Sequence, residues 1–247
     1  MKAILLCAGK GKRMKPYTNK LQKVMIPIRG KPLLEYIVEG IKFAGFKEVV
    51  IVVGYLKEQI VDYFQDGSKW DLNIEYVEQK TINGTGGAVL ACKDFIKTPH
   101  FFLTYGDILV PYKIYKQIYE IHKKEREDFV LVSNYLENIQ KGCSLLIEEH
   151  YLVTMTEKPP DDIITPKWNN CGIYIFSKEI FEVLYRISPS QRGEIELPDA
   201  ICLGIKERNW KVRVIKMEKH QFRGDFGDIQ EYEKFKKNTK WLKEIYE

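Results

Sequence analysis

The sequence lacks the features of a membrane-spanning, secreted or zinc-binding protein. No apolar run reaches the roughly 18 residues that a spanning helix needs, and the six-residue run at 3–8 is too short for a signal-peptide core. Five scattered cysteines form no Cys-x-x-Cys pair, and four histidines stand apart along the chain. We therefore predict no membrane span, no Cys/His metal site, and a reducing, cytoplasmic localisation in which the cysteines act as small buried apolar residues.

Composition excludes disorder but leaves the meaning of the charge open. The 247 residues are 45% hydrophobic and 30% charged, and 39 Lys and Arg against 34 Asp and Glu leave a formal charge of +5. Such an excess fits nucleic acid, an acidic surface or a small anionic substrate. Because basic and acidic residues alternate through 113–126 and 231–243, these segments are typical of solvated helix faces, and we expect no nucleic-acid partner.

The first half of the chain alternates between strand and helix patterns. Buried-strand runs end near glycines or turns, and apolar residues at helical spacing follow each of them. The pattern predicts strands at 3–7, 48–53, 73–77 and 100–105, and helices at 32–44, 57–64, 86–96 and 111–124. Alternation of this kind indicates an α/β protein with a Rossmann-like, doubly wound sheet.

In the second half of the chain, short strands with tight connections replace the regular alternation of strands and helices. Short strands are predicted at 129–133, 144–147, 152–156 and 172–176, helices at 178–186 and 197–208, a strand at 211–215 and a final helix at 229–246. The short strands predict a small antiparallel extension, which makes the sheet mixed. With no linker or internal repeat in view, and no hexapeptide β-helix repeat after the last helix, we expect one domain over 1–247.

A glycine loop follows the first strand, where a doubly wound sheet presents its ligand site. Gly9 and Gly11 would let backbone N–H groups approach phosphate oxygens, with Lys10, Lys12 and Arg13 as countercharges. The loop is neither a Walker A motif nor a dinucleotide fingerprint, since Met14 stands where the latter needs a third glycine. A basic surface turn remains the alternative to a phosphate site.

Seven further motifs extend the pattern in order. The loop reads L-x-A-G-x-G-x-R, with Lys23 ten residues later and then I-P-I-x-x-K-P-L-L-E-Y. It is followed by E-Q and G-T-G-G-A (78–88), Y-G-D (105–107), E-K-P (157–159), N-C-G-I-Y (170–174), R-G-E-I-E (192–196) and D-F-G (225–227). Together they resemble the sugar-1-phosphate nucleotidylyltransferases, or NDP-sugar pyrophosphorylases.

The resemblance implies transfer of a nucleotidyl group from an NTP to a sugar-1-phosphate, with Mg²⁺ as cofactor. Asp107 and Asp225 would bind the metal, and Arg13 and Lys23 would stabilise phosphate charge. Helix or turn capping is the alternative for both aspartates, with Asp228 as a competing cap near Asp225. The chain departs from the family pattern at Lys12, which replaces a small hydroxyl residue, and at Gln22 and Val24, which replace prolines around Lys23.

The remaining site predictions divide between base and sugar. Nucleotide contacts are expected from Leu6, Ala8, Gly9, Gly11, Lys12, Gln79, Gly84, Thr85 and Gly106. Sugar-phosphate contacts are expected from Gly142, Glu157, Lys158 and Asn170, whereas Glu194 could shape this pocket or cap a helix. Gln79 can read an imide edge, although an exposed strand-end amide is the plainer interpretation.

UTP or dTTP with a hexose-1-phosphate is the favoured substrate pair. The G-T-G-G-A run leaves a guanylyltransferase acting on mannose- or heptose-1-phosphate open, and a non-catalytic, nucleotide-sugar-binding regulatory paralogue is a further alternative. A glycosyltransferase is disfavoured, because Asp107-Ile108-Leu109 supplies one carboxylate where an Asp-x-Asp motif is needed. The expected partners are the NTP and the sugar-1-phosphate, with no nucleic acid and no membrane, and the resemblance allows a homo-oligomer.

Overall fold

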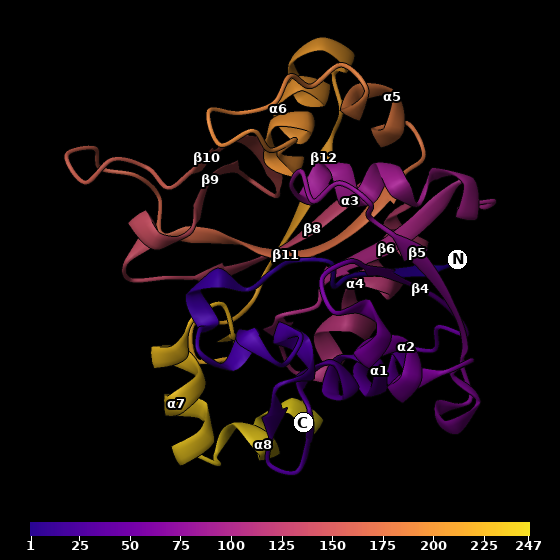
Figure 1. Cartoon of the computed structure of the whole chain (residues 1–247). Coiled ribbons are helices and arrows are strands. Elements are labelled where there is room, and N and C mark those ends of the chain that lie inside the picture. The colour runs from indigo at the N-terminus through magenta and orange to yellow at the C-terminus, as the bar shows by residue number, and fades with distance from the viewer. The chain divides into compact units, whose positions relative to one another are not determined.

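The computed structural model describes residues 1–247 (Figure 1). They group into two compact units. Unit 1 comprises Met1–Ile82, Thr104–Gln117 and Gln221–Glu247. Unit 2 comprises Asn83–Leu103 and Ile118–His220. The chain passes between the units within strand β6 (His100–Tyr105) and helix α4 (Tyr112–Glu125). The prediction of a single domain stays a prediction.

Unit 1 contains a parallel sheet in the order β5-β4-β1. Its strands are β1 (Ala3–Leu6), β4 (Glu48–Val53) and β5 (Asn73–Glu78), with Ala3 opposite Val49 and Glu48 opposite Asn73. Five of the six β4 residues are buried, as the β-branched run predicts for a central parallel strand. Helices α1 (Leu33–Phe43) and α2 (Lys57–Phe64) accompany these strands (Figure 1).

Short elements complete unit 1. Its remaining ordered backbone consists mostly of four single 3₁₀ turns, two pairs of two-residue strands and two C-terminal helices. They are the turns Lys12–Met14, Tyr17–Asn19, Lys23–Met25 and Ser68–Trp70, the pairs β2 (Pro27–Ile28) with β3 (Lys31–Pro32) and β7 (Ile108–Leu109) with β13 (Gly224–Asp225), and α7 (Ile229–Lys237) and α8 (Trp241–Tyr246).

Unit 2 contains a mixed sheet in the order β11-β8-β12-β10-β9. Only the β8–β12 pair is parallel, so the predicted antiparallel extension is confirmed. The strands are β8 (Phe129–Tyr135), β9 (Cys143–Glu148), β10 (Tyr151–Glu157), β11 (Trp168–Ser177) and β12 (Val212–Lys216). The other elements are α3 (Thr85–Ala91), α5 (Ile180–Leu184), α6 (Leu197–Arg208) and the 3₁₀ turns Lys93–Phe95 and Ile139–Lys141.

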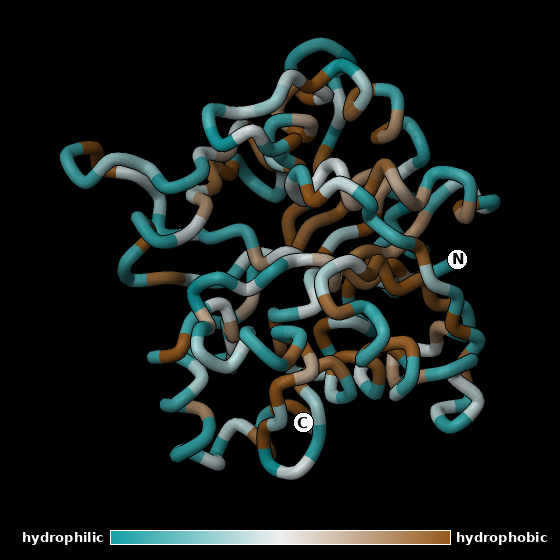
Figure 2. Tube along the Cα trace, in the orientation of Figure 1, coloured by the Kyte–Doolittle hydropathy of each residue, from teal (hydrophilic) through white to brown (hydrophobic).

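Hydrophobic segments follow the strands of both units, whereas most connecting loops are hydrophilic (Figure 2). Four of the five cysteines are buried and all five are free, in line with their predicted role as small apolar residues. No helix is both long enough and apolar enough to cross a bilayer.

Two helix predictions are wrong in extent. The helix predicted at 229–246 is interrupted at Asn238, whose backbone is extended, so that α7 and α8 are separate helices. The break accompanies burial of Trp241, whose indole N–H donates to the Phe235 carbonyl at 2.9 Å. The helix predicted at 86–96 ends at Ala91 and continues as a 3₁₀ turn.

The four histidines stand apart in the sequence, but two of them, His100 and His122, are in contact in the folded protein. In unit 2 the rings of His100 and His122 lie edge to face with centroids 4.7 Å apart. His100 Nε2 lies 2.7 Å from an Asp128 carboxylate oxygen, and His122 Nδ1 lies 2.7 Å from the Glu127 carbonyl oxygen. Burial and the neighbouring His100 lower the pKa of His122.

This lowered pKa predicts a loss of stability in mild acid. The unfolded chain takes up a proton at His122 at a higher pH than the folded chain does, so the free energy of unfolding should fall as the pH drops from about 7 to about 5. His122→Gln should flatten that part of the profile in urea unfolding. His150→Gln, at an exposed position, should leave the wild-type slope; equal slopes for both variants would contradict the assignment.

Candidate active site

The glycine loop of unit 1 packs against the turn that carries Lys23. Gly11 has a left-handed φ of +58°, and a Cβ there would lie 2.9 Å from Lys23 Cβ and 3.0 Å from Thr18 Cγ2. Both the backbone conformation and the close approach therefore require glycine. Lys12 and Arg13 follow in a 3₁₀ turn with exposed side chains, as the phosphate-site prediction requires of free cations.

Gln22 stands where the family pattern has a proline before the lysine, and its side chain holds the Lys23 turn in place by hydrogen bonds. Its side chain is fully buried. The amide oxygen accepts from Val24 N–H at 2.6 Å, and the amide nitrogen donates to the carbonyls of Cys7 at 2.5 Å and Gly9 at 3.4 Å. These bonds hold the Lys23 turn to the end of β1 and to the glycine loop, so the turn remains fixed without prolines.

Gly106 brings the end of β6 against the end of β1. Its N–H donates to the Leu6 carbonyl at 3.0 Å, and a Cβ at Gly106 would lie 2.5 Å from Cys7 Sγ. Only glycine allows this approach, which places the following residue, Asp107, at the carboxyl edge beside the glycine loop. Ala8 is fixed on the other side, where its carbonyl accepts from Tyr55 N–H at 3.1 Å.

A two-residue antiparallel ladder brings the two predicted metal ligands together. Asp225 of β13 lies opposite Ile108 of β7, and Phe226 N–H donates to the Asp107 carbonyl at 3.0 Å. The two aspartates are 118 positions apart in sequence, yet Asp225 lies in β13 and Asp107 directly precedes the paired strand β7. Asp228, not Asp225, caps α7 by accepting from Glu231 N–H at 3.0 Å, which removes the helix-capping alternative for Asp225.

Cations of the same unit hold the charge of Asp107. The Lys23 ammonium donates to the Asp107 carboxylate in a partly buried ion pair. Burial alone would raise the pKa of Asp107, but Lys23, with a smaller contribution from Arg223, outweighs it and holds that pKa below its usual range. Asp107 is therefore an ionised carboxylate, which is the form that binds a metal.

Arg223 is a candidate site residue that sequence reasoning missed. Its guanidinium donates to the Asp225 carboxylate at 3.2 Å. The signal was available, because residues two apart on an extended segment lie on the same face, and Arg223 stands two before Asp225. The D-F-G motif begins at Asp225 and does not include Arg223.

Gly227 leaves room for the Arg13 guanidinium beside the Arg223–Asp225 ion pair. A Cβ at Gly227 would lie 2.7 Å from Asp225 Oδ1 and 3.0 Å from Arg13 Nη2. The Gly227 N–H also donates to Asp225 Oδ1 at 2.9 Å. Arg13, Lys23, Asp107 and Asp225 are thereby gathered around the glycine loop of one unit.

The donor set fits Mg²⁺. No group of three or more His, Cys, Asp or Glu residues is arranged to hold a metal. The β7–β13 pairing instead brings two carboxylates, Asp107 and Asp225, to the glycine loop. Magnesium commonly takes one or two carboxylates and completes its octahedron with water and substrate phosphate oxygens. Asp107 and Asp225 suit a metal that is shared with a triphosphate.

The residues predicted to bind the base lie in both units. Gln79, just after β5, is buried, unlike the exposed amide of the plainer interpretation. In unit 2, a Cβ at Gly84 would lie 2.7 Å from the Ile195 carbonyl, and Thr85 Oγ1 accepts from Leu197 N–H at 3.1 Å. The G-T-G-G-A segment is therefore locked to the R-G-E-I-E segment.

Most of the residues predicted to bind the sugar phosphate meet at the β9–β10 pair of unit 2. Lys158 N–H donates to the Gly142 carbonyl at 2.8 Å, and Glu157 lies opposite Cys143 in the ladder. Lys158 has a left-handed φ of +46°, an uncommon conformation for a residue with a side chain. The surrounding protein removes part of the water around the Glu157 carboxyl and thereby raises its pKa. Lys158 and Arg192 act in the opposite direction. The residue nevertheless remains exposed to solvent.

Asn170 and Glu194 have structural partners. Asn170 donates to the Tyr174 hydroxyl at 2.6 Å and accepts from Gly172 N–H at 3.2 Å, so its amide is engaged within β11. Glu194 does not cap α6, because the N-cap residue is Glu196. The Glu194 carboxylate lies 4.0 Å from Arg192 Nε. Arg192 also forms an ion pair with Glu196 at 2.7 Å and acts electrostatically on Glu157.

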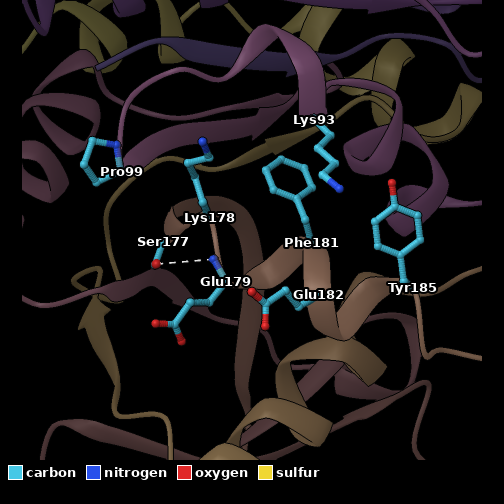
Figure 3. Close-up of a pocket in the computed structure, with 8 residues that line it drawn as sticks. All are labelled: Lys93, Pro99, Ser177, Lys178, Glu179, Phe181, Glu182 and Tyr185. Atoms are coloured by element: carbon cyan, nitrogen blue, oxygen red, sulfur yellow. Dashed lines mark hydrogen bonds between the residues drawn. The ribbon is translucent and has the colours of Figure 1, made fainter.

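A separate cavity of about 370 Å³ lies in unit 2 (Figure 3). It is lined by Lys93, Pro99, Ser177, Lys178, Glu179, Phe181, Glu182 and Tyr185. The Lys93 ammonium lies 4.8 Å from the centre of the Tyr185 ring. None of the lining residues was predicted as a site residue.

The comparisons with known proteins identify the class through fold and sequence. A solved UDP-glucose pyrophosphorylase complexed with UDP-glucose matches with a TM-score of 0.85 and 25% identity, over 96% of this chain and 97% of that one. The model of the family "Nucleotidyl transferase" matches residues 2–241. The chain belongs to this nucleotidyl transferase family.

Individual relatives carry different names. The bifunctional protein GlmU of Methanocaldococcus jannaschii is 39% identical over 227 residues, which are 88% of this chain and 49% of that protein. A glucose-1-phosphate thymidylyltransferase of Streptomyces griseus is 32% identical over 203 residues, 81% of this chain and 56% of that protein. The chain spans about half the length of the curated relatives it matches.

The Gln22 bonds predict a stability cost on their removal. Gln22→Leu should lower the free energy of unfolding by about 2–4 kcal/mol, because Val24 N–H and the Cys7 carbonyl lose their buried partner. Urea unfolding measures the loss. Gln230→Leu, at an exposed position, is the matched control; a loss no larger than the control's would mean that Gln22 does not hold the turn.

Proposed function

We propose that the protein is a sugar-1-phosphate nucleotidylyltransferase. A phosphate oxygen of the sugar-1-phosphate attacks the α-phosphorus of an NTP, the bond to the bridging oxygen of the β-phosphate breaks, and pyrophosphate leaves. The observation that carries this proposal is the β7–β13 ladder, which sets Asp107 beside Asp225 at a glycine loop with Arg13 and Lys23. Family membership supports the same reaction class.

Unit 1 supplies the groups that handle the triphosphate. Gly9 and Gly11 let the backbone approach phosphate oxygens, with Lys12 as countercharge, and Arg13 carries a permanent charge to offset the negative charge that grows on the leaving pyrophosphate. Lys23 would donate hydrogen bonds to the oxygens of the α-phosphate. Asp107 and Asp225 would hold Mg²⁺, which when bound supplies positive charge to phosphate oxygens and aligns them. No covalent nucleophile on the protein is needed, since positioning and charge lower the barrier.

Unit 2 supplies the groups for the sugar phosphate. Glu157 can accept bonds from two neighbouring hydroxyls, Lys158 can pair with the phosphate, and the Gly142 backbone adds a further contact. The Asn170 amide, already bonded to Tyr174 and Gly172, can contribute through its remaining donor and acceptor capacity.

UTP or dTTP with a hexose-1-phosphate is the proposed substrate pair. The Gln79 amide offers a donor and an acceptor to an imide edge, which uracil and thymine share. Gly84, Thr85 and Gly106 would supply the backbone around the nucleotide. A guanylyltransferase acting on mannose- or heptose-1-phosphate is the alternative, because the G-T-G-G-A run occurs there too.

A pyrophosphate-release screen tests the proposal. Five NTPs are combined with a panel of sugar-1-phosphates, with and without Mg²⁺. Metal-dependent release with UTP or dTTP and one hexose-1-phosphate is the expected result. Release with GTP alone would favour the guanylyltransferase, and no release together with measurable NDP-sugar binding would favour a regulatory paralogue.

Asp107→Asn should abolish turnover while the protein stays folded, because the amide keeps the size of the carboxylate but has no negative charge with which to hold Mg²⁺ or pair with Lys23. We expect at least a thousandfold loss in kcat, of the order seen when a charge-stabilising group is removed from an active site. Circular dichroism checks the fold. Asp94→Asn, at an exposed position, controls for loss of surface charge; full activity of Asp107→Asn would exclude the assignment.

A further inference from the structure

Each carboxylate of the proposed metal site is paired with a cation of the same unit. Lys23 pairs with Asp107, and Arg223 Nη2 donates to Asp225 Oδ2 at 3.2 Å. Arg223 also acts electrostatically on Asp107. With Arg13 beside the Asp225 pair, the nucleotide-free site therefore holds two negative and three positive charges in close proximity.

Arg223 is held firmly in this arrangement. Its side chain is only 13% exposed, whereas that of Asp225 is 43% exposed. It directly precedes β13, whose pairing with β7 fixes the backbone on both sides of Gly224. Because little water surrounds the guanidinium, its interaction with the carboxylates is screened less than that of a surface pair.

These charges act against a divalent cation that arrives alone. An incoming metal meets carboxylates whose charge is already offset, and it must also approach one ammonium and two guanidinium groups. A triphosphate reverses the balance, since it brings several negative charges to which Lys23, Arg13 and the metal are all attracted.

We propose that Arg223 is a positioning residue that holds the Asp225 carboxylate and keeps the affinity of the nucleotide-free site for divalent cations low, so that the metal is retained only together with the triphosphate. This inference rests on the proposed function, which assigns Asp107 and Asp225 to the metal. It assigns to Arg223 a task that the reaction itself does not require.

Binding of Mn²⁺, followed by the loss of the free-ion EPR signal, tests the proposal without any turnover. For the nucleotide-free full chain, Arg223→Met should bind Mn²⁺ about tenfold more tightly than the wild type, because one nearby positive charge is gone. After subtraction of the Mn²⁺ that UTP binds without protein, added UTP should tighten Mn²⁺ binding more in the wild type than in the variant. Arg223→Lys, which keeps the charge, should remain close to the wild type.

Two controls make the result specific. Arg186→Met removes a surface ion pair with Glu207 and should leave Mn²⁺ affinity unchanged, whereas Asp225→Asn added to Arg223→Met should abolish the gain. Should Arg223→Met not fold, Arg223→Gln removes the same charge and carries the same expectation.

An unchanged or weaker Mn²⁺ affinity in the charge-removing variant would overturn the proposal, as would a gain that survives Asp225→Asn. The readout needs no reaction, so an inactive wild type with the expected Mn²⁺ shifts would count against the proposed function and not against the role of Arg223.

Discussion

The pairing of β7 with β13 is the constraint on which the candidate site of unit 1 depends. Two residues on each strand and one further bond, from Phe226 N–H to the Asp107 carbonyl, bring the C-terminal segment back to the end of β6. Asp107 and Asp225 are 118 positions apart in the sequence, and this pairing is what brings them close in space. The ladder also fixes where Arg223 and Gly227 stand, and through Gly227 the position of the Arg13 guanidinium.

Close backbone approach explains the glycines around this ladder better than flexibility does. Gly106 and Gly227 have ordinary backbone angles, yet a Cβ at either would meet a neighbouring atom within 2.7 Å. Gly11 adds a left-handed φ to the same requirement. The result is a tightly packed framework from which the cations and carboxylates project.

Sequence reasoning succeeded where the signal was local. Apolar periodicity placed the strands of the first half and the antiparallel pairs of the second within a few residues, and motif order placed the chain in its family. It failed where distant residues decide the outcome. The break at Asn238 accompanies the burial of Trp241, and the His100–His122 contact joins a strand to a helix 22 positions away.

The amino-acid sequence by itself determined the alternation of strands and helices, the glycine loop and the residue types that suit phosphate and metal chemistry, since each of these depends on neighbours in the chain. The tertiary structure decided which charges meet. Lys23 with Asp107, Arg223 with Asp225, and Gln22 bridging β1 to the lysine turn are contacts across space. Their energies depend on burial and distance, and neither quantity is defined until the chain has folded.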